Sequence, residues 1–393
     1  MNRWTSAWLP ALLLAGGLRA QTNNALLQTM VSQAKATVAE AHPPYRTPFS
    51  VDHGKKEWLL DSFRNWRSGF WAGTQWYLFE ATGDAFWKQE ADKSTRILAE
   101  LLNKSPHSHD VGFQFTCSFG NALRLAKDPA YAKVMLRAAD SLATLYDPKY
   151  QSICSWPYRV KTLGWPHHVI VDNMMNLELL FWASKNGGSR KLYDIAVAHA
   201  RTTMKGHFRP DGSTAHVVWF DPATGQPDSM LTHQGHADGS MWARGQAWAI
   251  YGFTVVARET GDAVFLQTAR RAADMYLKRL PCDNIPYWDF DDPAIPSAPR
   301  DASAAAVVAS GLLELATLVK EPAVKLRYRN AALAMLDELS SPRYVKPWMN
   351  HAMLQHSTGN KPQGKDIDVP IIYADYYYME AMIRAGRFVK KVK

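Results

Sequence analysis

Two aspartates stand where a carboxyl group could act as an acid or a base. Asp110 lies in the sequence HDVGF, and Asp172 opens the sequence DNMMNL. Pairs of carboxyl groups carry out proton transfer at glycosidic centres. Both positions also look like helix starts, where aspartate is a preferred N-cap residue, and Asp301 and Asp368 stand at similar points. On position alone, capping is the commoner role of such an aspartate, so other residues must separate a catalyst from a cap.

Aromatic residues gather just before the apolar segments of the chain. Those in or beside the preceding loops are Trp66, Trp71, Trp156, Trp219, Trp242 and Trp248. Sugar rings have apolar faces that pack on aromatic rings, and an indole N–H can donate to a hydroxyl group. Tryptophan also fills helical cores, and we expect that role for Trp76 and Trp182, which lie deep in apolar segments. The loop tryptophans are therefore candidates for a carbohydrate site, with core packing as the alternative.

Three polar residues are further candidates for ligand binding: His216, Gln234 and Arg244. Arg244 begins an apolar helix, where a cation opposes the helix dipole unless an anion lies nearby. Because a guanidinium matches two carboxylate oxygens, we expect Arg244 to hold a substrate carboxylate. His216 alone is more often a structural histidine. His233 and His236 do not have the spacing of metal ligands, and we expect neither a required metal nor a cofactor.

Several chemistries are excluded by what the sequence lacks. It has no G-x-S-x-G nucleophile elbow, no Walker loop and no dinucleotide fingerprint before a helix. The formal net charge is +9, but lysine and arginine are scattered and no nucleic-acid-binding module is present, so we expect no nucleic-acid partner. Cys117, Cys154 and Cys282 are an odd number and far apart, so we expect buried thiols rather than a disulfide scaffold or a zinc site.

The elements that must position these residues form an irregular sixfold repeat. Apolar segments rich in small and aromatic residues begin near Gly69, Gly112, Asp172, Arg244, Asp301 and Asp368. Five of them end in a break containing Gly, Asp or Pro, which stops one helix and caps the next. Amphipathic segments follow, for example residues 130–145, 193–204 and 265–277, and residues 25–41 supply the sixth. This pattern predicts an all-α fold, an (α/α)6 toroid with an apolar inner ring and an amphipathic outer ring.

Such a toroid also predicts where a site would form. Every inner helix would run the same way, so all their N-termini would open at one end of the ring. Unpaired backbone N–H groups and positive dipole ends gather there and favour an anionic ligand. We therefore expect an aromatic pocket at that mouth, suited to a ligand that carries a carboxylate.

The N-terminus has the pattern of a secretory signal peptide. Arg3 precedes an apolar run over residues 7–14, and residues 18–20 resemble a cleavage site. We expect residues 1–20 to be removed and residues 21–393 to form one catalytic domain, exported to a periplasm or to the medium. No later stretch is long and uncharged enough to span a bilayer, so we expect no membrane partner. The sequence predicts no oligomeric state.

Four segments resemble sequences of glycoside hydrolase family 88, the unsaturated glucuronyl hydrolases. They are WARGQAWAIYG from Trp242, HDVGF from His109, DNMMNL from Asp172 and ADYYY from Ala374. The match runs in order from about Trp66 to Met382. This resemblance implies an (α/α)6 toroid. It also implies an unsaturated uronic-acid oligosaccharide as substrate, with the C4=C5 double bond that polysaccharide lyases leave.

The same resemblance implies roles for individual residues. Asp172 is expected to be the general acid and base, and Asp110 the second essential carboxylate. The subsite for the unsaturated sugar is expected to be lined by Trp66, His109, Trp156, His216, Gln234, Trp242, Arg244 and Trp248. Residues 355–368, where elements for the next sugar and its sulfate usually lie, are the least similar part, which leaves the leaving-group preference open.

The implied reaction begins with protonation of an enol ether at C4, and water then adds at C5. The alternative is a route that the sugar's own 2-hydroxyl assists. Asp172 then needs a raised pKa, which burial and the charge of Asp110 favour and a helix N-terminus opposes. Two alternatives share the fold: an unsaturated rhamnogalacturonyl hydrolase of family 105, and a noncatalytic sugar-binding toroid. The string that follows Trp242 favours family 88, and the two aspartates favour catalysis. A third alternative, an isomerase or epimerase, would be expected to use paired histidines and to lack an export signal.

Overall fold

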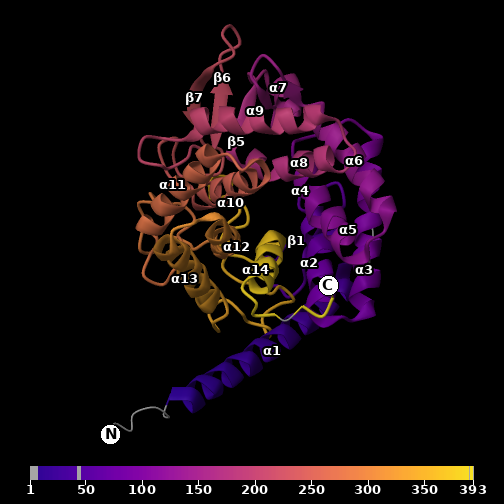
Figure 1. The fold of residues 1–393 in the computed structure, drawn as a ribbon, viewed down its shortest axis with the longest axis vertical. Helices are drawn as coiled ribbons and strands as arrows, with labels where there is room; N and C mark the ends of the chain where they lie inside the picture. Colours follow the sequence, from indigo (N-terminus) through magenta and orange to yellow (C-terminus); the bar gives the residue numbers. More distant parts are fainter. Residues whose placement is uncertain (1–7, 42–45, 389, 393) are drawn as a thin grey trace.

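The computed structural model describes residues 8–41, 46–388 and 390–392, and its helices form a closed ring of two layers (Figure 1). The predicted signal peptide falls partly on residues 1–7, outside the described residues. Residues 8–20 form the first turns of the long helix α1 (Trp8–Ala41), and their removal stays a prediction. Within the described ranges, no helix combines the length and apolar character that a membrane span requires.

The inner ring is built from six helical segments in the described part of the chain. They are α2 (Ser68–Thr82); α4, η2 and α5 (Val111–Phe115, Thr116–Gly120, Asn121–Ala126); η3 and α8 (Val171–Asn176, Leu177–Lys185); α10 (Ala243–Thr260); α12 (Ala302–Leu318); and α14 (Ile372–Arg384). Neighbouring segments pack around the ring, and α14 closes onto α2. Small residues permit this approach, since a Cβ on Gly252 would lie 2.5 Å from the Cβ of Met174. The predicted inner segments are therefore present, although the last begins at Ile372 rather than near Asp368.

The outer ring carries the amphipathic helices. They are α3 (Ala85–Arg96), α6 (Pro129–Ala143), α9 (Arg190–His207), α11 (Ala263–Arg279) and α13 (Pro322–Leu339). At the predicted breaks, the side chains that accept a backbone N–H as N-caps are Asp84, Asp128, Ser189 and Asp262. Helix α1 fills the sixth position. Gln33 and Thr37 on α1 donate to backbone carbonyls in the loop that precedes α14.

Short antiparallel strands, which the sequence analysis did not find, occupy the loops between the helices. They are β1 (Arg46–Ser50) with β2 (Leu59–Ser62), β3 (Tyr146–Asp147) with β4 (Ser152–Ile153), and the sheet β5-β6-β7 (His168–Ile170, Val217–Phe220, Pro227–Leu231). The remaining short elements are η1 (Ile97–Asn103), α7 (Pro157–Leu163) and η4 (Lys361–Gln363). Figure 1 shows β6, β7 and α7 together at the top of the view, beyond α9. Strands of two to five residues are too short to show an alternating pattern in the sequence.

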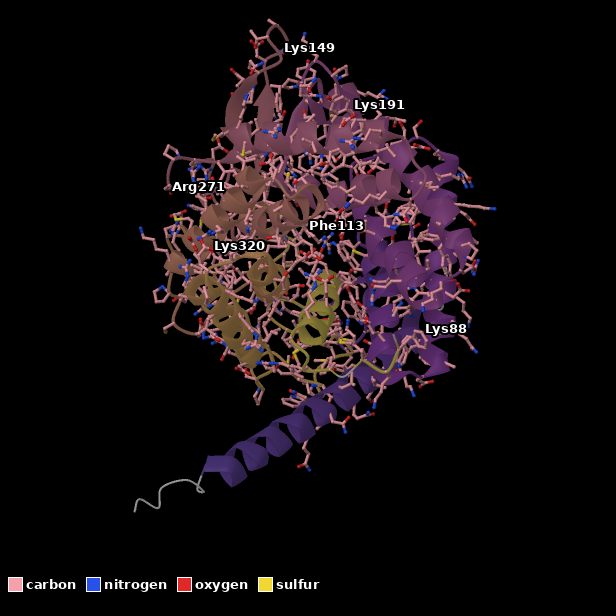
Figure 2. The ribbon with its side chains drawn as sticks, in the orientation of Figure 1. Lys88, Phe113, Lys149, Lys191, Arg271 and Lys320 are labelled. Carbon is pink, nitrogen blue, oxygen red and sulfur yellow. The ribbon has the colours of Figure 1, made fainter. Side chains whose placement is uncertain are left out.

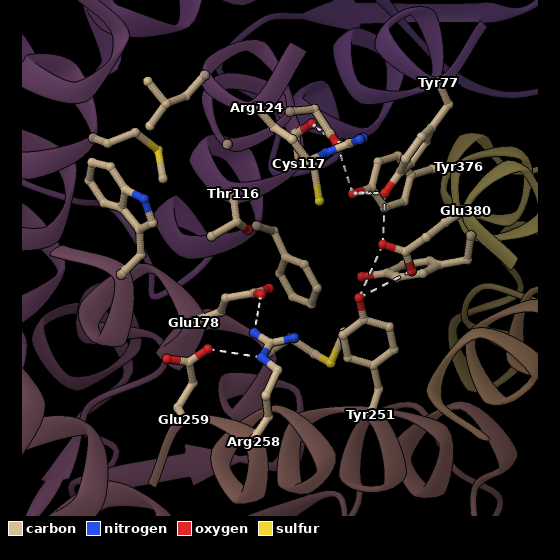
Figure 3. Close-up of a pocket in the computed structure, with 18 of the residues that line it drawn as sticks. Tyr77, Thr116, Cys117, Arg124, Glu178, Tyr251, Arg258, Glu259, Tyr376 and Glu380 are labelled. Atoms are coloured by element: carbon tan, nitrogen blue, oxygen red, sulfur yellow. Dashed lines mark hydrogen bonds and ion pairs between the residues drawn. The ribbon is translucent and has the colours of Figure 1, made fainter. Parts of the chain in front are cut away.

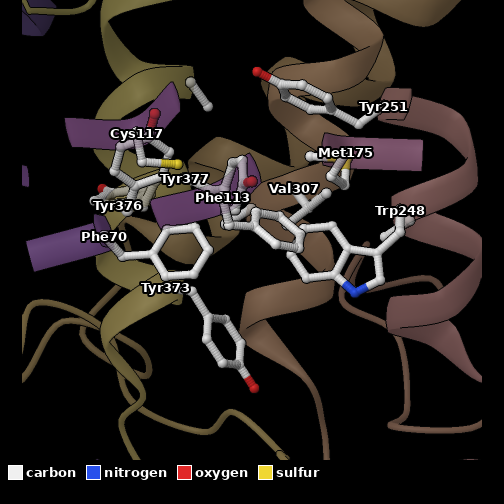
Figure 4. Close-up of a cluster of buried hydrophobic side chains, with 14 of the residues drawn as sticks. Phe70, Phe113, Cys117, Met175, Trp248, Tyr251, Val307, Tyr373, Tyr376 and Tyr377 are labelled. Atoms are coloured by element: carbon white, nitrogen blue, oxygen red, sulfur yellow. The ribbon is translucent and has the colours of Figure 1, made fainter. Parts of the chain in front are cut away.

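An aromatic cluster fills the middle of the ring (Figure 4). Phe70, Phe113, Trp248, Tyr373 and Tyr377 are all buried in it. The ring centroids of Phe113 and Trp248 lie 5.4 Å apart in an edge-to-face arrangement, which aromatic pairs prefer. Among the side chains labelled in Figure 2, Phe113 lies near the centre, whereas Lys88, Lys149 and Lys191 lie near the outline of the molecule. The middle of the ring is therefore a packed aromatic core.

Candidate active site

A cavity of about 720 Å³ lies at the end of the ring where the inner helices begin. This volume falls within the roughly 300–1,000 Å³ typical of small-molecule sites. Half of the predicted site residues line it, namely Trp66, Asp110, Trp156, Asp172 and Gln234. The others, namely His109, His216, Trp242, Arg244 and Trp248, are buried side chains that are not part of the cavity wall. The two aspartates thus open onto one cavity, at the mouth that the toroid predicts.

Strand pairing places Asp172 beside His216. Residues Ile170 of β5 and Val217 of β6 are paired, and the N–H of Val171 donates to the carbonyl of His216 at 2.9 Å. One residue beyond this bridge, Asp172 turns into the first turn of η3, with its Oδ2 3.7 Å from Nε2 of His216. The N-cap of η3 is Ile170, and Asp172 lies within the first turn, so the N-cap interpretation is wrong for this residue.

Burial controls the acidity of Asp172. Its pKa is raised from 3.8 to about 7, first by burial and further by the charge of Asp110, while the charge of Arg244 acts in the opposite direction. Among the described residues, Oδ2 of Asp172 has no hydrogen-bond partner. An acid that is half protonated near neutral pH can donate a proton and then accept one. Burial therefore dominates the competing effects that the sequence left open.

Asp110 lies in a wetter environment than Asp172. Its carboxylate accepts a hydrogen bond from Oγ of Ser108 at 2.6 Å and is partly exposed in the cavity. Although it precedes α4, it caps no backbone N–H of that helix. Asp301, in contrast, accepts from the N–H groups of Ser303 and Ala304 and is a true N-cap of α12. The capping role that position suggests therefore holds for Asp301 and not for the two cavity aspartates.

Each cavity aspartate is accompanied by a neutral histidine with a defined tautomer. Nδ1 of His216 accepts from the backbone N–H groups of His233 and Gln234 at 3.1 and 3.2 Å, so its proton must be on Nε2. Nε2 of His109 likewise lies 3.5 Å from Oδ1 of Asp110. Burial lowers the pKa of both imidazoles, and the charge of Asp110 partly opposes this for His109. Two neutral N–H donors thus face the two carboxyl groups.

Asn176 sets the tautomer of His109, and the sequence analysis missed it. Its Oδ1 accepts from the N–H of Phe113 at 2.7 Å, which orients the amide so that Nδ2 donates to Nδ1 of His109 at 2.8 Å. Gly112 makes this bridge possible, because a Cβ there would lie 2.3 Å from the Cβ of Asn176. His109 and Asn176 both stand in segments that resemble the family. Their contact joins positions 67 residues apart, so it cannot be inferred from either segment alone.

Arg244 does lie beside an anion, but this anion is Asp301 of the same chain rather than a substrate. Its Nη1 lies 3.0 Å from Oδ2 of Asp301, and its guanidinium also donates to the carbonyls of Thr358 and Gly359. The side chain is fully buried against Trp242, with the cation 4.6 Å from the ring centroid. Asp301 therefore satisfies the need for an anion that the sequence assigned to a substrate carboxylate. Arg244 acts on Asp172 through its charge, from outside the cavity wall.

The tryptophans divide between cavity wall and core. Trp66 and Trp156 both line the cavity. Trp66 stacks on Tyr373 with ring centroids 5.6 Å apart, and Trp156 lies beside His233. Trp71, Trp242 and Trp248, which were candidates for exposed sugar platforms, are almost fully buried. Trp76 is a core residue as expected, and its indole donates to Thr95.

A second cavity, of about 550 Å³, lies at the opposite end of the ring (Figure 3). Basic residues lie in the last turns of inner helices there, where the negative ends of the helix dipoles favour a cation. Two of them, Arg124 and Arg258, are paired with Glu80 and Glu178.

Cys117 is buried in the wall of this second cavity, and burial raises the pKa of the thiol. Cys154 is buried as expected, but Cys282 is exposed, which corrects the prediction for that residue. In the ranges that the structure describes, no three His, Cys, Asp or Glu side chains form a metal-ligand cluster.

Comparison with known proteins identifies relatives along most of the chain. No family model matches it. An unsaturated glucuronyl hydrolase of Formosa agariphila is 43% identical over 333 residues, which cover 84% of this chain and 82% of that protein. One of Bacillus sp. (strain GL1) is 35% identical over 347 residues, covering 86% and 91%. A crystal structure of an unsaturated glucuronyl hydrolase specific for heparin superposes with a TM-score of 0.86 at 38% identity, covering 94% and 96%.

A helical toroid with two carboxyl groups in the cavity at its N-terminal mouth fits a glycoside hydrolase. The chain belongs to the unsaturated glucuronyl hydrolases, glycoside hydrolase family 88. The resemblance drawn from WARGQAW and the other segments is thereby confirmed, and so are the single-domain toroid and the enzyme class.

Proposed function

We propose that this chain removes a Δ4,5-unsaturated glucuronyl residue from the non-reducing end of oligosaccharides that polysaccharide lyases produce. The relatives supply the class of reaction. The proposal depends on one observation about Asp172. This carboxyl group is buried on the wall of the cavity and has a pKa of about 7.

In the proposed mechanism, protonated Asp172 donates its proton to C4 of the substrate. The electron pair of the C4=C5 bond forms the new C4–H bond and leaves positive charge shared between C5 and the ring oxygen. The carboxylate of Asp172 then accepts a proton from water as the water oxygen bonds to C5. The resulting hemiketal opens to a ketone at C5, and the hemiacetal left at C1 collapses to an aldehyde and releases the next sugar. The net change is the addition of one water.

In this scheme the other residues bind the sugar and adjust the pKa of Asp172. The Asp110 carboxylate raises the pKa of Asp172 and accepts hydrogen bonds from sugar hydroxyls. Trp66 and Trp156 offer aromatic rings on the wall of the cavity, and Gln234 offers an amide. The Nε2–H of His216 stabilises the carboxylate form of Asp172 after proton transfer, when the gap of 3.7 Å can close.

The test uses the ultraviolet absorbance of the conjugated double bond, which disappears on hydration. Purified protein is mixed with unsaturated disaccharides prepared by defined lyases from chondroitin, heparin, ulvan, xanthan and gellan. Wild type bleaches at least one of them, and Asp172→Asn lowers the rate by at least about a hundredfold, in line with a lost general acid. Asp228→Asn, a change of the same chemistry at an exposed position on β7, keeps the wild-type rate. Absence of bleaching across all five sets refutes the function, and normal activity in Asp172→Asn refutes the acid assignment.

We further propose that the protein is exported to a periplasm or to the medium. The support is the charge and apolar pattern of residues 1–20. Expression in a Gram-negative host followed by N-terminal sequencing of the periplasmic product tests this. A mature protein that begins at Gln21 supports export, whereas a cytoplasmic product that retains Met1 refutes it.

A further inference from the structure

Arg159 is a cation on the cavity wall whose orientation is fixed by the protein. It lies on α7, with its guanidinium 4.4 Å from the ring centroid of Trp156 and 4.5 Å from that of Trp165. Nη2 lies 3.0 Å from Nε2 of His233, and because arginine only donates, this nitrogen of His233 accepts. Burial, and then the charge of Arg159, lowers the pKa of His233 to about 4, so the imidazole stays neutral. Two indole rings and a neutral histidine therefore hold the guanidinium in place.

None of the interactions that Arg159 makes with a described residue is with an anion. Its hydrogen bonds are with the Tyr158 hydroxyl and His233. The buried or partly buried cations Arg67, Arg244 and Lys361 have carboxylate partners, in Asp366, Asp301 and Asp292. Arg64 and Lys104 also line the cavity without a carboxylate partner among the described residues, but both are exposed, whereas Arg159 is partly buried and held by the groups around it. An oriented guanidinium without an anion is preorganised for one that arrives with a ligand, since its planar fork matches two oxygens.

The position of Arg159 assigns it to the outer part of the cavity. Asp172 is almost fully buried, and the charge that acts on it is that of Arg244 and Asp110, while Arg159 is partly exposed. Next to Arg159, His107 stacks on Tyr158 with ring centroids 4.4 Å apart, and Lys104 also lines this wall. Because C4 of the unsaturated sugar must reach Asp172, the sugar that follows it lies toward Arg159 and this basic rim.

We propose that Arg159 binds an anionic substituent, such as a sulfate ester, on the leaving sugar and selects substrates that carry one. This rests on the proposed function. The family resemblance placed such recognition in residues 355–368, which hold two lysines. Lys361 lies 2.8 Å from Asp292 and over the ring of Trp288, and neither Lys361 nor the exposed Lys365 lines the cavity. In this chain Arg159 on α7, which does line the cavity, takes over the role.

The experiment compares two unsaturated chondroitin disaccharides that differ only in a sulfate on the hexosamine. Wild type has the higher kcat/KM on the sulfated one. Arg159→Gln loses about tenfold to a hundredfold in kcat/KM on that substrate, mainly through KM, because one charge-assisted interaction is removed. Its rate on the unsulfated disaccharide stays within about twofold. Lys161→Gln removes the same charge from an exposed position on the same helix, away from the cavity wall, and changes neither value.

Added salt and a conservative variant separate binding from a structural role. In wild type, the preference for the sulfated substrate falls as ionic strength rises, and this dependence is lost in Arg159→Gln. Arg159→Lys keeps the charge without the fork and gives an intermediate preference, which also serves if Arg159→Gln does not fold. Equal losses on both substrates, or no loss on either, overturn the proposal for Arg159. Failure of wild type to hydrolyse either disaccharide, or any other lyase product, instead overturns the proposed function.

Discussion

The pKa of Asp172 predicts a pH dependence of activity that can be worked out in advance. The acid form is needed for proton donation, and burial raises its pKa from 3.8 to about 7. At pH 6 an ordinary aspartate would be protonated in about 0.6% of molecules, whereas one with a pKa near 7 is protonated in about 90%, a gain of more than a hundredfold in active acid. We therefore expect kcat/KM for an unsaturated disaccharide to be high near pH 6 and to fall about tenfold per pH unit above pH 7.

The same shift can be measured without catalysis. The pKa of Asp172 is about 7 in the folded protein and 3.8 for an ordinary aspartate, as in the unfolded chain. Between these two pH values the folded state binds the proton more tightly than the unfolded state. The stability that this contributes at low pH is therefore lost as pH rises from 3.8 through about 7. Asp172→Asn cannot ionise. Between pH 5 and pH 8.5 the unfolding free energy of wild type should therefore fall by about 2.5 kcal/mol relative to that variant. Urea unfolding of both proteins at the two pH values measures it. A difference below about 1 kcal/mol, with activity falling already above pH 5, would refute a burial-raised pKa.

Two further substitutions test the bridge that Asn176 makes between Phe113 and His109. Gly112→Ala places a methyl group 2.3 Å from the Cβ of Asn176, so we expect a loss of about 1–3 kcal/mol in stability and at least about tenfold in kcat. Gly239→Ala, where nothing lies within 4 Å, is the control, and equal behaviour of the two variants contradicts the bridge. Asn176→Asp keeps the acceptor for Phe113 but removes the donor to His109. It should shift the imidazole proton to Nδ1, visible in nitrogen-15 spectra, and lower kcat; an unchanged spectrum contradicts the tautomer assignment.

The ring could be predicted from the sequence because its signals are local. Apolar periodicity and the breaks at Asp84, Asp128, Ser189 and Asp262 mark helices and their caps within a few residues, and the structure places an N-cap at each of these. The common mouth then follows from the repeat alone. That Asp110 and Asp172 open onto one cavity satisfies the condition on which the catalytic interpretation depends.

What could not be predicted depends on contacts between distant segments. His216 reaches Asp172 only because β5 pairs with β6, and such short strands leave no pattern in the sequence. Arg244 was expected to bind substrate, since a guanidinium at a helix start needs an anion. The sequence could not show that Asp301, a residue correctly suspected of capping, would also be that anion. Only the folded ring brings these charges together.

The aromatic cluster at the centre of the ring also limits how the enzyme can work. Phe113, Tyr376 and Tyr377 form part of the wall of the far cavity, and none of them lines the catalytic one. The two cavities have no lining residue in common, so the toroid is not a tunnel. A polymer cannot be threaded through it and trimmed processively. The active site accepts one chain end at a time. Both products must leave through the opening by which the substrate entered before another end can bind.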